Sequence, residues 1–277
     1  MPAAAAPAPA GLAEAKSPGL GARDGLGAAF ELKYQLDPDD AARVEAWAHQ
    51  HLHPDRHGDR GRYRITSVYC DTPGLDVFHR NPGFKRNKYR VRRYDAAARI
   101  FVERKTKRGD RVTKRRTDID PAELAHLLAD APPEAWPAGW FATRVRSRNL
   151  RPTCCVSYRR TAFFGMAGDM PVRMTIDRDM VGVPATDWQV PHIQEGHALL
   201  PDAVLVELKF HLHMPPLFQD LLSLLPGQLA RASKYRRCIS LCGIWDGQPP
   251  AGAPAGGAAP VEGVPQAGTD VLPRGIA

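Results

Sequence analysis

The chain has 277 residues, of which 43% are hydrophobic, and 38 Lys and Arg against 30 Asp and Glu give a formal net charge of +8. This composition is typical of a globular protein with an ordinary core, and no apolar run approaches the roughly 18–20 residues that span a bilayer, which excludes a membrane-spanning segment. The basic balance favours an anionic partner: nucleic acid, an anionic membrane surface or a phosphate-rich small molecule.

The two ends of the chain differ in composition from the part between them. Residues 1–27 and 247–277 consist mainly of Ala, Pro and Gly. They contain no aromatic and few branched side chains, whose burial compensates the entropy of ordering, so we predict two disordered tails. The N-terminal tail has no basic region leading into an apolar segment, so we expect no secretory signal. Residues 28–246 are predicted to form a single domain.

Eight segments of this domain have the residue pattern of β-strands. They cover residues 28–36, 63–71, 85–94, 99–107, 111–119, 152–164, 172–181 and 203–211. Gly109-Asp110, between the fourth and fifth segments, is the signal of a two-residue hairpin turn.

Helices are predicted between the strands. Asp37-Pro38-Asp39-Asp40 supplies an N-cap, a proline at the first helical position and an acidic first turn, and it opens a helix that runs to about His53. Asp120-Pro121-Ala122-Glu123 similarly supplies an N-cap, a proline and an acidic residue, in a pattern close to a capping box, and predicts a second helix start. A third helix is predicted over 217–225. The last begins at Ser233 and places Tyr235, Cys238, Ile239 and Cys242 on one face.

Eight strands with intervening helices predict an α+β fold, namely a closed antiparallel β-barrel with flanking helices, because closure removes exposed strand edges. Residues 144–148 alternate arginine with Val145 and Ser147, which we interpret as an extended segment with a solvated face.

The five cysteines exclude a disulfide framework, because their number is odd and Cys154 and Cys155 are adjacent. None has the C-x-x-C spacing of a zinc site. We therefore expect reduced, structural thiols in a soluble, cytoplasmic protein, which could still lie at the cytoplasmic face of a membrane through a partner.

Charged and apolar side chains alternate along five of the predicted strands. In one of them Lys88, Arg90 and Arg92 oppose Tyr89 and Val91. The commonest cause of such alternation is a sheet with one dry face and one solvated face. We favour the alternative that the charged faces turn inward, because Arg and Lys predominate there over Ser, Thr and Gln. About ten cations would then converge on one lumen and require a polyanion to neutralise them.

Several short motifs, in their order and spacing, resemble the VTC (vacuolar transporter chaperone) catalytic domain, a branch of the triphosphate tunnel metalloenzymes. The resemblance covers roughly residues 28 to 243. Its motifs are Glu31-Leu32-Lys33-Tyr34, Ser67-Val68-Tyr69-Cys70-Asp71-Thr72, Lys88-Tyr89-Arg90-Val91-Arg92, Glu103-Arg104-Lys105, Lys114-Arg115-Arg116, Tyr158-Arg159-Arg160, Arg173-Met174-Thr175-Ile176-Asp177, Glu207-Leu208-Lys209-Phe210 and Ser233-Lys234-Tyr235.

Members of this family are polyphosphate polymerases, so the resemblance implies transfer of the ATP γ-phosphoryl group to a growing polyphosphate chain with release of ADP. ATP and polyphosphate are the expected partners. The residues expected to act in the transfer are Lys33, Arg90, Arg92, Lys105, Arg160 and Arg173. Those expected to bind substrate are Lys114, Tyr158 at the nucleotide end, Lys209, Arg231, Ser233 and Lys234.

The expected cofactor is a divalent metal, Mn²⁺ or Mg²⁺. Glu207 matches the metal-ligand position of the family, and Glu31 and Glu103 are further candidates. Hydrolytic tunnel enzymes carry an E-x-E-x-K run on the first strand, but here Ala29 stands at the first Glu position. Fewer carboxylates bind fewer metals and activate water less well, which favours a polymerase over a hydrolase.

The sequence leaves other functions open. A triphosphatase of the same fold is one alternative, and a non-catalytic module that binds polyphosphate or nucleotide is another. A nucleic-acid binder is less favoured, because no DNA- or RNA-binding motif accompanies the charge. The family's membrane segment and phosphate-sensing domain have no counterpart, so we expect any export of polyphosphate to need a separate membrane protein.

Overall fold

The computed structural model describes residues 29–245 except residues 96, 110, 224, 226–228, 231 and 232. The two predicted tails and Arg231 lie outside the described residues.

The described part of the chain consists of long strands with short helices between them. The strands are β1 (Ala29–Leu36), β2 (His53–Pro54), β3 (Arg62–Asp71), β4 (Asn87–Tyr94), β5 (Ile100–Arg108), β6 (Arg111–Ile119), β7 (Arg151–Ala167), β8 (Met170–Pro184), β9 (His197–Ala198) and β10 (Val204–Phe210). The helices are α1 (Pro38–His51), α2 (Asp76–His79), the 3₁₀ helix η1 (Pro121–Leu127), α3 (Gly139–Ser147), α4 (Pro216–Ser223) and α5 (Lys234–Leu241).

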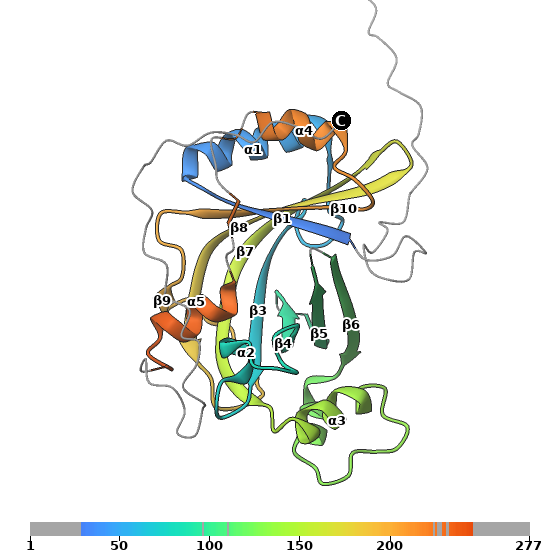
Figure 1. Ribbon diagram of the computed structural model, residues 1–277, viewed down its shortest axis with the longest axis vertical. Coiled ribbons are helices and arrows are strands. Elements are labelled where there is room, and N and C mark those ends of the chain that lie inside the picture. The colour runs from blue at the N-terminus through green and yellow to red at the C-terminus, as the bar shows by residue number, and fades with distance from the viewer. Residues whose placement is uncertain are drawn as a thin grey trace, which may run out of the picture. The chain divides into compact units, whose positions relative to one another are not determined.

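The eight longer strands close into a ring (Figure 1). They follow the hydrogen-bonding order β7-β3-β4-β5-β6-β1-β10-β8, and β8 pairs with β7 again to complete it. Every pairing is antiparallel, and the shortest seam joins β1 to β6 through Ala29↔Val112 and Phe30↔Arg111. The predicted closed antiparallel barrel is therefore confirmed. Each of the eight strands has a neighbour on both sides, so closure protects the sheet edges.

Helices cover the apolar outer faces of the ring. Helices α1 and α4 pack over β1, β8 and β10, where Val44 and Phe218 join Val206 and Leu208 in one core cluster. At the other end of the domain, α3 and η1 cover β4, β5 and β6 through a second cluster that includes Phe141 (Figure 1). Side chains alternate between the two faces of a strand, so the charged residues that alternate with these covered apolar residues point inward.

Helix α5 packs against inward-facing side chains of the ring. Tyr235, Cys238 and Ile239 lie on its buried face, as predicted, and share a cluster with Tyr69 and Tyr158. Ser233 caps the helix by accepting a hydrogen bond from the Arg236 amide. The N-terminal end of α5 therefore delivers Ser233 and Lys234 to the interior of the ring.

The predicted helix starts are confirmed at two further positions. Asp37 accepts a hydrogen bond from the Asp40 amide at 2.8 Å and caps α1. Asp120 and Glu123 form a complete capping box, although the helix that follows is 3₁₀ rather than α.

The prediction of an extended segment at 144–148 is wrong, because residues 139–147 form helix α3. Phe141, Ala142 and Val145 are buried at helical spacing, and this apolar face determines the conformation more strongly than the alternating arginines. Within the described residues, no helix is long and apolar enough to cross a membrane.

Candidate functional site

The interior of the ring contains a cluster of ion pairs contributed by strands far apart in sequence. Strand pairing places Lys33 opposite Glu207 and Arg90 opposite Glu103. We define the tunnel cluster as four carboxylates and the ten cations around them. The carboxylates are Glu31, Glu103, Asp177 and Glu207, and the cations are Lys33, Lys88, Arg90, Arg92, Lys105, Lys114, Arg116, Arg160, Lys209 and Lys234.

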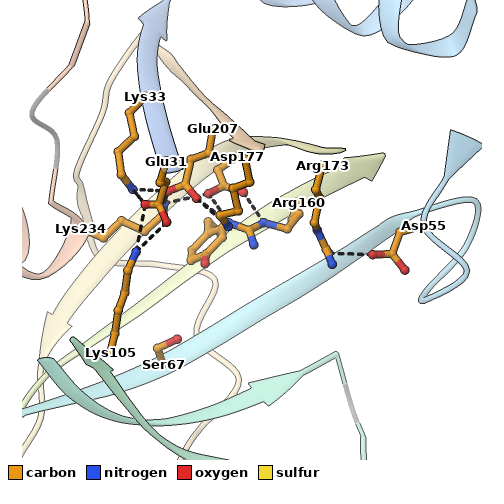
Figure 2. A network of polar contacts seen from close by, with 12 residues as sticks. Glu31, Lys33, Asp55, Ser67, Lys105, Arg160, Arg173, Asp177, Glu207 and Lys234 are labelled. Carbon is orange, nitrogen blue, oxygen red and sulfur yellow. Dashed lines mark hydrogen bonds and ion pairs between the residues drawn. The ribbon is translucent and has the colours of Figure 1, made fainter. Parts of the chain in front are cut away.

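Glu207, on β10, lies at the centre of the tunnel cluster (Figure 2). One carboxylate oxygen pairs with the ammonium groups of Lys33 and Lys234, the latter at 3.6 Å. The other lies 3.4 Å from Nζ of Lys209 and 4.0 Å from the Arg160 guanidinium. Four cations from four different elements thus share a single carboxylate, which alone neutralises only one of them.

Asp177, on β8, is fully buried and holds two of the same cations. Its carboxylate accepts a bidentate pair of hydrogen bonds from Arg160 at 2.6 and 2.8 Å, a geometry that fixes the guanidinium plane. It also lies 2.7 Å from Nζ of Lys234. The same two cations lie over the ring of Tyr158, so the tyrosine forms part of the wall of this cationic region.

Glu31, on β1, joins two lysines. Its carboxylate lies 2.9 Å from Nζ of Lys33 and accepts two hydrogen bonds of 2.9 Å from Nζ of Lys105. Lys33 therefore lies between the carboxylates of Glu31 and Glu207 (Figure 2).

Glu103, on β5, pairs with a second group of cations farther along the wall of the tunnel. Arg90 donates to it at 2.6 Å, and Arg116 and Lys114 lie at 3.6 and 3.9 Å. Arg92 next to them has no carboxylate within ion-pair distance among the described residues. Its guanidinium instead donates to Ser67 at 2.9 Å and to the Tyr158 hydroxyl at 3.3 Å.

With every Lys and Arg counted as protonated, the tunnel cluster has a formal surplus of six positive charges, ten cations against four carboxylates. Such a surplus in a partly enclosed site repels itself and is relieved by a bound polyanion. Arg supplies bidentate donors for phosphate oxygens and Lys supplies compact charge, so the side chains suit a chain of phosphates.

The structure places most of the sequence-predicted residues in this cluster or, like Tyr158 and Ser233, in contact with it, but one stands apart. Arg173 points toward Asp55 at 2.7 Å and the Tyr63 hydroxyl at 3.0 Å, to one side of the Glu207 group (Figure 2). Arg231 lies outside the described residues.

Four residues of the site were missed by sequence reasoning about function. Asp177 and Arg116 are members of the tunnel cluster, and Ser67 positions Arg92. Lys88 donates to Ser233 at 2.7 Å, and no described carboxylate lies within ion-pair distance of it. The alternation along β4 had put Lys88 on the face of Arg90 and Arg92, and that signal alone could have identified it.

Opposing effects set the protonation of the carboxylates. Burial raises the pKa of Glu207, but the ammonium groups of Lys33, Lys234 and Lys209 and the Arg160 guanidinium outweigh it and hold that pKa well below its usual range. Burial and Glu207 likewise raise the pKa of Glu31, and Lys33 and Lys105 overcome both. Both carboxylates are therefore ionised at neutral pH.

The lysines respond in two ways. Burial lowers the pKa of Lys33, but Glu207 and Glu31 raise it above its ordinary value. Burial lowers the pKa of Lys209 to about 8 despite the opposing effect of Glu207. Burial, together with the ammonium groups of Lys105 and Lys33, holds the pKa of Lys88 well below its usual range. An anion bound beside Lys88 would raise that pKa again.

The carboxylates fit a divalent cation only in combination with phosphate. No group of three or more His, Cys, Asp or Glu side chains within the described part of the chain could hold a metal ion. Glu207 lies close enough to Glu31 to raise the pKa of Glu31, and the ammonium of Lys33 lies between the two carboxylates. Mg²⁺ is commonly held by one or two carboxylates together with substrate phosphates and water. Glu31 and Glu207 can provide the carboxylates.

Comparisons with known proteins identify the family. A family model described as the VTC domain matches residues 28–242. No curated protein matches the sequence significantly.

Solved structures resemble the chain at low identity. A Hippeastrum protein, described as a candidate adenylyl cyclase with a dominant triphosphatase activity, is 14% identical with a TM-score of 0.47, over 76% of this chain and 95% of that chain. A candidate adenylate cyclase from Bacillus halodurans is 12% identical with a TM-score of 0.46, over 76% and 97%. A Pyrococcus horikoshii protein is 13% identical with a TM-score of 0.43, over 76% and 99%.

Proposed function

The chain belongs to the VTC domain family, and from this membership and the tunnel cluster we propose that it is an ATP-dependent polyphosphate polymerase. ATP would donate its γ-phosphoryl group to the end of a growing polyphosphate chain, and ADP would leave. The observation that carries the proposal is the surplus of six positive charges inside a closed ring of strands.

A protein catalyses phosphoryl transfer mainly by positioning the reactants and neutralising charge, because the transition state spreads negative charge over the phosphoryl oxygens. A terminal oxygen of the polyphosphate chain attacks the γ-phosphorus while the bond to the oxygen that bridges the β- and γ-phosphates breaks. Arg160 is held in one plane by Asp177, and Arg92 by Ser67 and Tyr158, so both present fixed donors. Lys33 and Lys234, beside Glu207, supply charge where the phosphates would converge.

Glu207 and Glu31 would hold a divalent cation, which supplies further neutralisation of phosphate oxygens when bound. Binding of the cation and phosphates would draw Lys33 away from its position between the two carboxylates and onto a phosphate oxygen. The β1 residue Ala29 adds no third carboxylate at the beginning of the strand. A metal site with two carboxylates binds fewer metal ions and activates water less well than a site with more of them. This favours transfer to phosphate over hydrolysis, and hence a polymerase over a triphosphatase.

Incubation of the full chain with ATP and either Mn²⁺ or Mg²⁺ tests the proposal. We expect ADP and polyphosphate to form together, with one ADP for each phosphate added and no turnover in the presence of a chelator. Orthophosphate release without polymer would identify a triphosphatase instead. Tight binding of polyphosphate with no metal-dependent turnover would identify a binding module.

A further inference from the structure

A second basic region lies on the outside of the ring, on the opposite face of the strands that line the tunnel. A groove of about 690 Å³ opens between the loop before β4 and the β5–β6 hairpin. We define the outer basic groove by its five cationic lining residues, Lys85, Arg86, Arg104, Arg108 and Arg111. The other residues that line it are uncharged.

The hairpin that forms this groove is unusually basic. Residues 104–116 contain eight Lys or Arg and one acidic residue. Lys105 and Lys114 are cross-strand partners on the inner face, where they belong to the tunnel cluster. The next pair toward the turn, Thr106↔Thr113, therefore lies on the outer face.

On the outer face, like charges lie directly opposite each other. Arg104 pairs with Arg115, and Arg108 pairs with Arg111. Like-charged residues in directly opposed positions destabilise a sheet, so a sheet face with two such pairs and only threonines between them is unfavourable by itself. A bound anion would compensate this repulsion.

The cations of the groove are not neutralised by the rest of the described protein. None of the five has an ion pair with a carboxylate among the described residues, whereas most cations of the tunnel cluster have one. Nε of Arg104 is buried and has no hydrogen-bond partner in the described part of the chain. The guanidinium of Arg111 lies over the ring of Phe30, at 5.7 Å from the ring centroid. No described carboxylate therefore competes with an external anion for these donors.

The position of the groove favours one occupant. Because β5 and β6 belong to a closed ring, the end of β5 and the beginning of β6 lie at a rim of the tunnel. Arg108 and Arg111 on the outside lie three positions along their strands from Lys105 and Lys114 on the inside. We propose that the outer basic groove binds the polyphosphate chain where it passes over the rim of the tunnel. This inference rests on the proposed function, which supplies the linear polyanion.

Replacement of exposed groove residues tests the proposal in the full chain. The variant Arg86→Gln/Arg108→Gln/Arg111→Gln should bind long-chain polyphosphate about tenfold more weakly, because it loses three exposed charge contacts, each of modest strength. Its salt dependence of binding should also be shallower, because fewer cations contact phosphate. Binding of tripolyphosphate, which occupies the tunnel alone, should not change. Equal long-chain affinity in this variant and the parent would overturn the proposal.

A matched variant controls for net charge. Arg56→Gln/Arg144→Gln/Arg151→Gln removes three exposed arginines from other elements and should leave long-chain binding near the parental value. An equal loss in both variants would show that only net charge matters and would overturn the assignment of a site. Single-stranded DNA or anionic vesicles that bind more tightly than polyphosphate, with the same dependence on the groove, would overturn the choice of ligand.

These measurements use no ATP, so they separate the two proposals. If the chain makes no polymer from ATP but long-chain binding depends on the groove, the polymerase proposal fails and the groove remains. If polymer forms and groove variants bind long chains normally, the groove proposal fails alone.

Discussion

Lys88 and Ser233 join the wall of the tunnel to the beginning of helix α5, because Nζ of Lys88 donates a hydrogen bond of 2.7 Å to Oγ of Ser233. The two residues are 145 positions apart in sequence. Lys88 lies among the cations Lys105, Lys33 and Arg90, which lower its pKa together with burial. A phosphate bound near the N-terminal end of α5 would provide a counter-ion for the ammonium group of Lys88.

We therefore predict that phosphate binding is coupled to proton uptake by Lys88. With its pKa well below the usual range, Lys88 gives up its proton more readily in the empty tunnel, and a bound anion raises that pKa again. Titration calorimetry with tripolyphosphate in buffers of different ionisation enthalpy measures the uptake. Lys88→Gln should reduce it and weaken binding, while Lys85→Gln, on the outer face, should do neither. Identical proton uptake in Lys88→Gln and the parent would contradict the prediction.

A second prediction concerns the two arginines of β4. Arg90 and Arg92 share the inward face, and Arg90→Ala/Arg92→Ala should nearly abolish binding of ATP and of polyphosphate. A hydrogen bond to a charged partner contributes about 1.5–3 kcal/mol, so each substitution alone should weaken binding by roughly tenfold or more. Thermal melting should accompany the binding assay, because loss of Arg90 leaves buried Glu103 with weaker neutralisation. Unchanged affinity in a folded double variant at moderate salt would place these arginines outside the substrate path.

Much of this arrangement could be predicted from the sequence, because alternation along a strand identifies which side chains share a face. Glu31 and Lys33 on β1, and Glu207 and Lys209 on β10, were assigned to charged faces in this way. The pairing between the strands could not be predicted. Lys33 lies opposite Glu207 although the two are 174 positions apart in sequence, and nothing local in either strand indicates that register.

The remaining differences also have physical causes. Helix α3 was missed because its alternating arginines have a strand-like spacing, whereas the burial of Phe141 and Val145 follows helical spacing. The counter-ion role of Asp177 was missed because its bidentate contact with Arg160 depends on the β7–β8 pairing. Long-range contacts of this kind come from tertiary structure and have no local signature.

A third prediction concerns pH. Burial lowers the pKa of Lys209 to about 8, and Lys105 and Lys114 also have a lowered pKa because of burial. Raising the pH through 8 removes positive charge from the tunnel, so affinity for tripolyphosphate should fall between pH 7 and 9. Lys209→Arg should retain more affinity at pH 9, because arginine stays charged.

Stability should change in the opposite direction over the same range. Between pH 8 and the ordinary lysine pKa of about 10.4, the unfolded chain holds protons that the folded tunnel has lost, so the free energy of unfolding rises with pH. Affinity should thus decrease while the melting temperature in the absence of ligand increases. A parallel loss of affinity and stability would instead indicate general alkaline unfolding and contradict the assignment to tunnel lysines.

The last prediction separates binding from chemistry at Glu207. Its carboxylate contacts Lys33, Lys209, Lys234 and Arg160, so a purely structural counter-ion is a serious alternative to a metal ligand. If Glu207 holds the metal, Glu207→Gln should remain folded, bind polyphosphate more tightly because a negative charge is gone, and lose metal-dependent turnover. If it is only a counter-ion, the variant should be less stable through unbalanced positive charge, while the remaining turnover keeps its normal metal dependence.

Glu103→Gln is the matched comparison, because Glu103 is equally buried and likewise neutralises several cations, among them Arg90 and Lys114. Both variants remove one buried negative charge from the tunnel cluster, so any effect of charge balance on stability should be similar. Only Glu207 lies beside Glu31 with Lys33 between them, so only Glu207→Gln should change the Mn²⁺ or Mg²⁺ titration of ADP formation. Full activity of Glu207→Gln with an unchanged metal titration would remove Glu207 from the metal site.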